Sequence, residues 1–215
     1  MRIIELGLTD FLEAYEIQSE LVKKVSQGLS DNTLLITEHR PVITIGRRGS
    51  QENILKTKEF LSSHNIEIVY VARGGDVTYH GPGQIIAYPI FKLENEGRDI
   101  HRFLDFLEEV GRHFLEQYGL LGERRPGFRG IWIDGKKIGS LGIGVKRWVT
   151  YHGLAINVNT DLTPFSFIRP CGIKGAEISS LKNLLGYDLE IRDAKDRLEA
   201  SFKKISLLAE AVSKS

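Results

Sequence analysis

The glycine-rich segment at residues 73–84, RGGDVTYHGPGQ, crowds arginine, threonine, tyrosine, histidine and glutamine into twelve positions. Consecutive glycines after a strand can present several backbone N–H groups to one oxygen-rich ligand. Arg73 and His80 add a cation and a titratable donor. The alternative is a connecting turn with incidental polar residues, but loops on a rigid scaffold are where binding sites usually lie. The segment is therefore predicted to be a substrate-binding loop.

Cys171 is the only cysteine of the chain and stands in the sequence IRPCGI. A lone cysteine is often a small buried hydrophobe. Here Pro170 and Gly172 indicate a turn, and Arg169 and Lys174 make the surroundings electropositive, which favours the reactive thiolate. The residues alone leave both roles of Cys171 open, a nucleophile or a packing residue.

Lys136 and Lys137 follow an Asp-Gly pair and lead into a run rich in glycine. In a strand their side chains point to opposite faces, so one can face solvent while the other points inward. An exposed pair that aids solubility is the alternative. An inward lysine near a cysteine would serve as a partner of the thiolate and as a proton shuttle.

The six histidines show no spacing typical of a zinc site, and one cysteine makes a cysteine zinc site improbable, so no metal and no other cofactor is expected. The pentapeptide Val-Thr-Tyr-His-Gly occurs twice, at 77–81 and at 149–153. Its flanks do not extend the match. It is either coincidence or two segments that meet the same chemical demand.

Length and composition indicate one globular unit. The chain has 215 residues, 41% hydrophobic and 27% charged residues and a net charge of +1. A nearly neutral chain has no global field that would attract nucleic acid or a membrane. No apolar run reaches the roughly 18 residues that span a bilayer, and the first residues do not resemble a signal peptide. The expected location is the cytoplasm, with neither nucleic acid nor membrane as a partner.

Strand and helix signals are interleaved along the chain, which predicts an α+β fold: a mixed or antiparallel sheet with packed helices, in a single domain over residues 1–215. Helices are expected at 9–27, 57–63, 99–118 and 192–212. Strands are expected at 33–37, 42–46, 66–71, 85–91 and 149–158, and 131–145 is expected to be a hairpin that turns at Asp134-Gly135. Residues 73–84 and 164–175 are expected to be irregular.

Four segments of the sequence resemble those of a known enzyme family. RGGDVTYHGPGQ, KIGSLGIGV, TYHGLAINV and IRPCGI occur in the order and spacing of lipoyl(octanoyl) transferases, and EHRPVITIGRRG at 38–49 resembles their N-terminal region. The similarity runs from about residue 33 to residue 182. Gly139 stands where the family more often has alanine, a change between small residues.

The resemblance implies a biotin/lipoate protein ligase-like fold and a two-step transfer without ATP. Octanoyl would move from octanoyl-acyl-carrier protein, through a thioester on Cys171, to a lysine of the lipoyl domains of 2-oxoacid dehydrogenases and of the glycine cleavage H protein. Lys137 would lower the pKa of Cys171 and shuttle protons. The residues expected to contact the substrate are Arg73, Gly74, Gly75, Asp76, Val77, Thr78, Tyr79, His80, Ser140, Leu141, Gly142, Gly153, Leu154 and Ala155.

Three other functions compete with this one. An ATP-dependent lipoate or biotin protein ligase shares the fold but needs no cysteine nucleophile. A cysteine hydrolase could use Cys171 with His80 or His152 and would release free fatty acid. A carrier-binding protein would leave the thioester whole. Turnover with a protein acceptor separates the transferase from all three.

Overall fold

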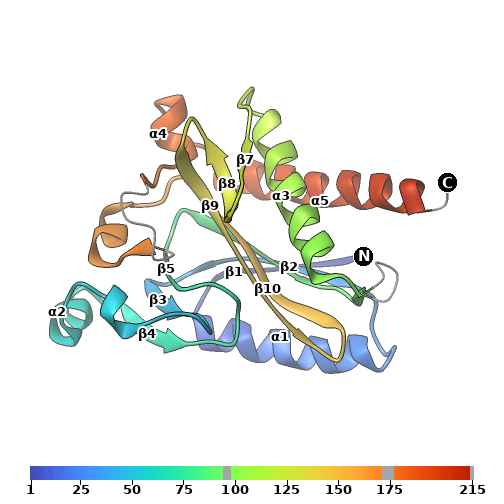
Figure 1. The fold of residues 1–215 in the computed structure, drawn as a ribbon, viewed down its shortest axis with the longest axis horizontal. Helices are drawn as coiled ribbons and strands as arrows, with labels where there is room; N and C mark the ends of the chain where they lie inside the picture. The colour runs from blue at the N-terminus through green and yellow to red at the C-terminus, as the bar shows by residue number, and fades with distance from the viewer. Residues whose placement is uncertain (94–97, 171–176, 214–215) are drawn as a thin grey trace.

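A seven-stranded sheet forms the centre of the molecule. The structure, a computed structural model, describes residues 1–93, 98–170 and 177–213. The strands lie in the order β1-β2-β6-β10-β9-β8-β7 (Figure 1). Only β1 and β2 run parallel, and the other neighbours are antiparallel, so the predicted mixed sheet is confirmed. The strand bounds are β1 Arg2–Thr9, β2 Thr33–His39, β6 Gln84–Ile90, β7 Glu123–Arg125, β8 Phe128–Ile133, β9 Lys136–Lys146 and β10 Val149–Asn157.

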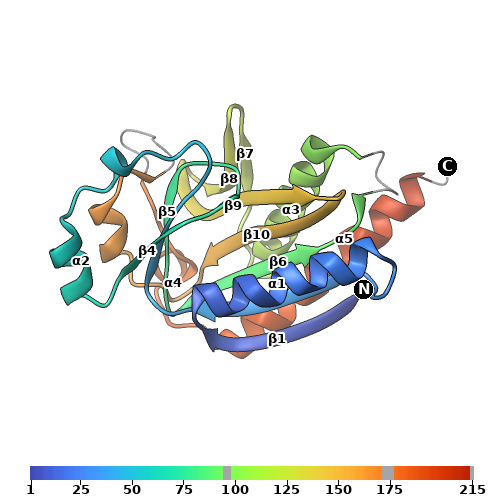
Figure 2. The same cartoon turned by 90° about the horizontal axis from the view of Figure 1, so that it is seen from below.

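Helices cover both faces of this sheet (Figures 1 and 2). Helix α1 (Phe11–Ser26) lies on one face, where Leu21, Val22 and Val25 pack against side chains of β2, β6 and β10. Helices α3 (Ile100–Glu116) and α5 (Ile191–Ser213) lie together on the other face and cover a larger apolar core. Each helix has one apolar side, as the helical spacing of its hydrophobic residues predicts.

A smaller sheet stands beside the main one. It has the order β4-β3-β5, with β4 at Glu67–Tyr70, β3 at Val42–Ile45 and β5 at Val77–His80. Its core also contains side chains of α2 (Lys58–Ser63) and of the 3-10 helix η3 (Thr163–Phe167). The short helices η1 (Gln51–Asn53) and α4 (Leu181–Leu185) complete the described elements.

Most predicted elements are confirmed, and the differences have local causes. The predicted hairpin turns at Asp134 and Gly135, which both have positive φ (48° and 75°), as a tight hairpin requires. Strand β1 was not expected; it pairs with β2, and the register of this pairing shifts between Glu5 and Gly7. Part of the predicted loop at 73–84 is wrong, since Val77–His80 forms strand β5 along β3. The short elements β7 and α4 were also missed.

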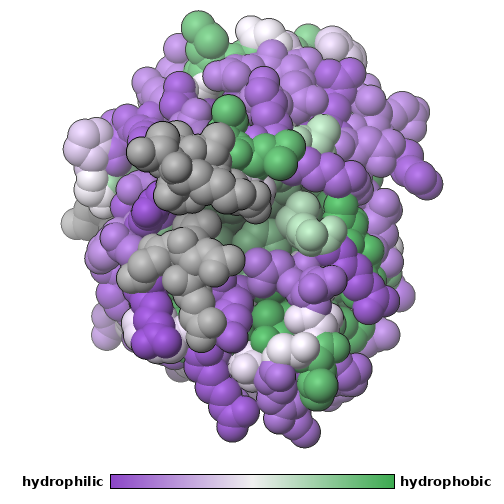
Figure 3. Space-filling view, turned by 90° about the vertical axis from the view of Figure 1, so that its right-hand side faces the viewer, coloured by the Kyte–Doolittle hydropathy of each residue, from purple (hydrophilic) through white to green (hydrophobic). Residues whose placement is uncertain are grey.

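The surface carries charge of both signs. On the face shown in Figure 3, hydrophilic residues cover most of the area and hydrophobic residues gather in smaller groups between them. In the described part of the chain, no helix combines the length and the hydropathy that a membrane span would need.

Candidate active site

The segment 73–76 lies between the two sheets and is fixed by backbone hydrogen bonds from both sides. The N–H of Gly74 donates to the carbonyl of Ile143 in β9 at 2.8 Å, and the N–H of Arg47 donates to the carbonyl of Arg73 at 3.0 Å. A side chain on Gly142 would meet the carbonyl oxygen of Gly74 at 2.8 Å, so glycine permits this close approach. The predicted loop is therefore rigidly placed, and the Gly74 N–H is already used within the protein.

Arg73 is a buried residue that ties this segment to β3. Its Nη2 donates to the carbonyl oxygen and to Oγ1 of Thr44, both at 2.8 Å, and its Nη1 donates to the carbonyl of Gly74 at 3.0 Å. Only 8% of the residue is exposed. Arg73 thus places a cation beside the site and also has a structural role.

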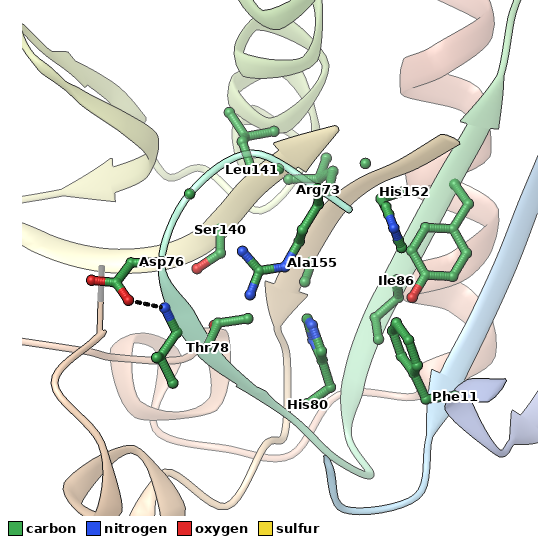
Figure 4. Close-up of a pocket in the computed structure, with 16 residues that line it drawn as sticks. Phe11, Arg73, Asp76, Thr78, His80, Ile86, Ser140, Leu141, His152 and Ala155 are labelled. Carbon is green, nitrogen blue, oxygen red and sulfur yellow. Dashed lines mark hydrogen bonds between the residues drawn. The ribbon is translucent and has the colours of Figure 1, made fainter. Parts of the chain in front are cut away.

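A narrow chamber opens next to this segment, over the face of the main sheet that α1 covers (Figure 4). Its cavity volume is about 40 Å³. Side chains from β5, β6, β9 and β10 and from the start of α1 form its walls. The lining residues are Phe11, Arg73, Gly75, Asp76, Val77, Thr78, His80, Ile86, Tyr88, Ser140, Leu141, Gly142, His152, Gly153, Leu154 and Ala155.

The structure gathers most of the predicted substrate-binding residues around this chamber. Gly74 lies instead in the adjoining cleft. Tyr79 lines neither space, because β5 alternates: Thr78 and His80 face the chamber, while the Tyr79 ring packs on Phe165 in the core of the small sheet, with ring centroids 5.6 Å apart. The predicted substrate contacts lacked four lining residues, Phe11, Ile86, Tyr88 and His152, of which His152 was considered only as the base of a hydrolase.

The repeated pentapeptide brings two histidines to one place. His80 ends β5 and His152 lies in β10, and both line the chamber. His39, at the end of β2, is close to them, with its ring centroid 6.1 Å from that of His80. The repeat is a sequence signal that points to His152 beside His80. The tyrosines of the two copies differ in their surroundings, since Tyr79 packs on Phe165 in the small sheet and Tyr151 packs in the core under α1.

All three imidazoles are buried and electrically neutral. Burial is the main cause that lowers the pKa of His80 and His152 to about 3 and that of His39 to about 4. Nδ1 of His80 lies 2.6 Å from Oε1 of Gln84, and Nδ1 of His39 lies 2.9 Å from the carbonyl oxygen of Thr9. Because these oxygens only accept, Nδ1 carries the proton in both rings.

A wider cleft of about 500 Å³ adjoins the chamber. The two spaces share Gly75, Asp76, Leu141 and Gly142 as lining residues. The cleft adds the side chains of Lys137 and Arg129, and hydrophobic residues at its rim. The further lining residues are Arg48, Gly74, Ile100, Leu104, Gly127, Phe128 and Ile143.

Lys137 points into this cleft from the start of β9, and the residue is only 3% exposed. Its Nζ lies 5.6 Å from the ring centroid of Trp132. Its side chain crosses Gly130, where any added Cβ would meet Cε of Lys137 at 2.8 Å. Lys136 faces outward and pairs with Glu177 at 2.9 Å. The predicted division between an inward and an outward lysine is therefore confirmed.

Cys171 lies outside the described residues, as does Lys174. The chain on either side of them is described and is anchored near the cleft. The N–H of Arg169 donates to the carbonyl of Asn53 at 2.8 Å, and Nδ2 of Asn53 donates to Oδ2 of Asp76 at 2.7 Å. Beyond the gap, the N–H of Lys137 donates to the carbonyl of Glu177 at 2.8 Å. The hydrogen bonds before the gap thus connect the chain to Asp76, which lines both the chamber and the cleft, and the hydrogen bond after the gap connects it to Lys137.

No cluster of histidine and carboxylate side chains within the described ranges could hold a metal ion. The ionisable side chains that line the chamber and the cleft include the imidazoles of His80 and His152, the carboxyl group of Asp76, and the buried Arg73 and Lys137.

Comparison with known proteins agrees with this architecture. A lipoate protein ligase from Thermoplasma acidophilum has the same fold, with a TM-score of 0.73 at 16% identity over 95% of this chain and 82% of the other. A biotin protein ligase from Aquifex aeolicus gives a TM-score of 0.57 at 14% identity over 95% and 69% of the two chains. The fold is the predicted one, the fold of biotin and lipoate protein ligases.

The sequence gives a narrower assignment. Residues 10–203 match the lipoyl protein ligase A/B catalytic domain family. An octanoyltransferase of Geotalea uraniireducens is 46% identical over 203 residues, which cover 94% of this chain and 92% of the relative. The chain belongs to the lipoyl protein ligase A/B catalytic domain family, and within it to the octanoyltransferases. It is a transferase enzyme.

Proposed function

We propose that this enzyme transfers an octanoyl group from octanoyl-acyl-carrier protein to a lysine of lipoyl domains, through a thioester on Cys171. The acceptors would be the lipoyl domains of 2-oxoacid dehydrogenases and the glycine cleavage H protein, and the reaction would take place in the cytoplasm. The observation that carries the proposal is a narrow chamber that joins a cleft lined by the buried Lys137, whose backbone N–H donates to the carbonyl of Glu177, six residues after Cys171.

Chain connectivity supports a role for Cys171 at the junction of chamber and cleft. Arg169, which stands two residues before Cys171 in the sequence, lies in the part of this segment that the structure describes. Arg169 is held by Asn53, which in turn holds Asp76 at the chamber mouth. An acyl chain in the chamber would therefore have its thioester end at Asp76, close to the segment that leads into Cys171.

In the first step, the Cys171 thiolate attacks the thioester carbonyl of the donor. The bond from the acyl carbon to the phosphopantetheine sulfur breaks, and this sulfur leaves as a thiol after it takes a proton from the Lys137 ammonium. One thioester replaces another, so the step is close to thermoneutral and needs no ATP. The cation of Lys137 stabilises the attacking thiolate.

In the second step, the acceptor lysine attacks the acyl-enzyme as a neutral amine. The bond from the acyl carbon to Sγ of Cys171 breaks, an amide forms, and the amine proton passes through Lys137 to restore the starting state. Conversion of a thioester to an amide is downhill. Backbone N–H groups at the junction would stabilise the tetrahedral oxyanion, although those of Gly74 and Val77 are already bonded to Ile143 and Asp76.

The geometry counts against the hydrolase alternative. A general base works best with a pKa near the working pH, whereas burial lowers the pKa of His80 and of His152 to about 3. Both imidazoles also line the chamber, where they would contact the proposed acyl chain.

One incubation tests the proposal: octanoyl-acyl-carrier protein with the enzyme, without ATP and without acceptor, followed by intact mass spectrometry. We expect one octanoyl adduct on the wild-type chain and no adduct on Cys171→Ala. A lipoyl domain added next should remove the adduct and carry octanoyl on its lysine. A requirement for ATP would indicate a ligase, free octanoate would indicate a hydrolase, and an intact thioester in a stable complex would indicate a binding protein.

A further inference from the structure

The chamber has an open end and a closed end. The open end is formed by the residues that it shares with the outer cleft, among them Asp76 and Leu141. In Figure 4 these residues and Ser140 lie on one side, Arg73 and His80 lie in the middle, and Phe11, Ile86 and His152 lie on the opposite side. A linear chain that enters from the cleft therefore meets Phe11 and His152 last.

A second hollow lies directly behind this closed end. It has a cavity volume of about 290 Å³ and opens beside α1 and the β9–β10 hairpin, with Tyr15 and Tyr151 among its lining residues. It shares no lining residue with the chamber. The His152 ring stands between the two spaces: its centroid is 6.1 Å from that of Phe11 on the chamber side and 5.5 Å and 4.9 Å from those of Tyr15 and Tyr151 on the other.

His152 reaches this position through an unusual backbone conformation. Alternation along β10 directs Tyr151 and Ala155 toward α1, and Leu154 and Ile156 toward α3 and α5, so residue 152 would be expected to face α3 and α5. Its φ is +56°, a left-handed value that is uncommon outside glycine, and the ring turns to the α1 side. Gln18 of α1 accepts the His152 backbone N–H at 2.7 Å and holds this conformation.

The buried imidazole of His152 also reduces the stability of the fold. Among the described residues, Nε2 of His152 is one of the few buried side-chain atoms without a hydrogen-bond partner. A strained backbone and an unsatisfied buried nitrogen both reduce stability. Both features occur in one residue at the end of the proposed substrate chamber. We infer that His152 is kept there for the function of the chamber wall rather than for the packing of the core.

We propose that Phe11 and His152 form a partition that ends the acyl chamber and sets the longest acyl chain that the enzyme accepts. The inference rests on the proposed acyl transfer. Each methylene buried in the chamber contributes about fourfold to affinity, until the chain reaches the partition. A longer chain must displace one of the two rings, so its transfer falls. Removal of the His152 ring joins the chamber to the hollow behind it, and removal of the Phe11 ring lengthens the chamber itself, so each change gives longer chains room.

Two variants test the partition. Phe11→Ala removes one ring, and His152→Asn shortens the other while it keeps a residue that tolerates positive φ. The measurement is the kcat/KM for transfer from hexanoyl-, octanoyl-, decanoyl- and dodecanoyl-acyl-carrier protein to a lipoyl domain. We expect the ratio of dodecanoyl to octanoyl transfer to rise at least tenfold in either variant. Leu12→Ala, at an exposed position (54%) next to Phe11, is the matched control and should keep the wild-type ratio.

The outcomes separate the two proposals. If both variants fold cooperatively and keep the wild-type ratio, or if the wild type transfers dodecanoyl as readily as octanoyl, the partition is not the determinant. If the wild type transfers no acyl chain of any length, the proposed function itself fails. If Phe11→Ala does not fold, Phe11→Leu, which keeps an apolar side chain of similar size, and His152→Asn decide the question.

Discussion

Tyr88 donates its hydroxyl hydrogen to Nε2 of His39 across a buried distance of 2.7 Å. Because Nδ1–H of the same ring donates to the carbonyl of Thr9, the neutral imidazole has both nitrogens satisfied. A protonated ring would carry a hydrogen on Nε2, and the Tyr88 hydroxyl would have to turn and accept it. Because Tyr88 lines the chamber, this hydrogen bond links the chamber wall to the protonation state of His39.

Tyr88→Phe should destabilise the fold, because it leaves Nε2 of His39 buried without a donor. The expected loss in the free energy of unfolding is about 1–3 kcal/mol, measured by urea denaturation at pH 7.5. Tyr187→Phe removes a hydroxyl from an exposed residue and serves as the control. Equal stability of the two variants would show that the hydrogen bond contributes little.

Stability should fall as the solution is acidified. The folded-state pKa of His39 is about 4 and those of His80 and His152 are about 3, all below the ordinary value of 6.5, so the unfolded chain binds more protons between these limits. The neutral histidines make their full contribution to the free energy of unfolding above pH 6.5, and this contribution is lost as the pH falls toward 3–4. Each histidine adds a slope of at most about 1.4 kcal/mol per pH unit.

Urea denaturation at pH 7.5, 6.0 and 5.0 measures this slope. His152→Asn should reduce it, since asparagine does not titrate there, and the exposed His101 changed to Asn should not. A wild-type stability that is constant between pH 7.5 and pH 5.0 would contradict buried neutral histidines.

Lys137→Met should reduce transfer severely and leave the chamber intact. Methionine keeps an unbranched apolar stem of similar length across Gly130 but cannot donate or accept the proton, so kcat should fall by about 10²–10⁴. Lys136→Met removes only an exposed ion pair with Glu177, a contact of small energetic value. Its transfer rate should stay within about threefold of the wild type.

The pH at which wild-type Cys171 reacts with iodoacetamide gives an independent check. Loss of the Lys137 cation should raise that pH, whereas Lys136→Met should not change it. If Lys136→Met had the stronger effect on both measurements, the inward lysine would not be the proton shuttle.

Arg73→Ala should reduce stability as well as activity. The guanidinium is buried and donates to Thr44 and to Gly74, so its loss should cost about 2–3 kcal/mol of unfolding free energy. Arg47→Ala, at an exposed position three residues after Thr44, is the control and should stay within about 0.5 kcal/mol. An Arg73→Ala protein as stable as the wild type would assign Arg73 to substrate binding alone.

The sequence predicted correctly those elements whose conformation is determined by residues close together in the chain. The Asp134-Gly135 turn and the helix that follows Asp99 depend on residues that are neighbours in the chain. The inward position of Lys137 follows from the same hairpin. Strand β5 was missed because its glycine-rich flanks resemble a loop, and only pairing with β3, more than thirty residues earlier, makes it a strand.

The closed end of the chamber could not be predicted in the same way. Phe11 occupies a position on α1 that is equally suited to core packing, and nothing near it in sequence indicates a partner in β10. The turn of His152 toward α1 contradicts strand alternation, so pattern alone places the ring on the wrong face. Such exceptions to local rules are most often found at functional sites.

The central place of β10 has a consequence for the nascent chain. On one side β10 pairs with β6, and on the other with β9. Until residues 149–157 leave the ribosome, β6 is an apolar strand with an unpaired edge, and the chamber lacks one wall. Open apolar edges recruit foreign strands, so we expect the nascent chain to be most prone to mispairing while the more than sixty residues from β6 to the end of β10 are synthesised.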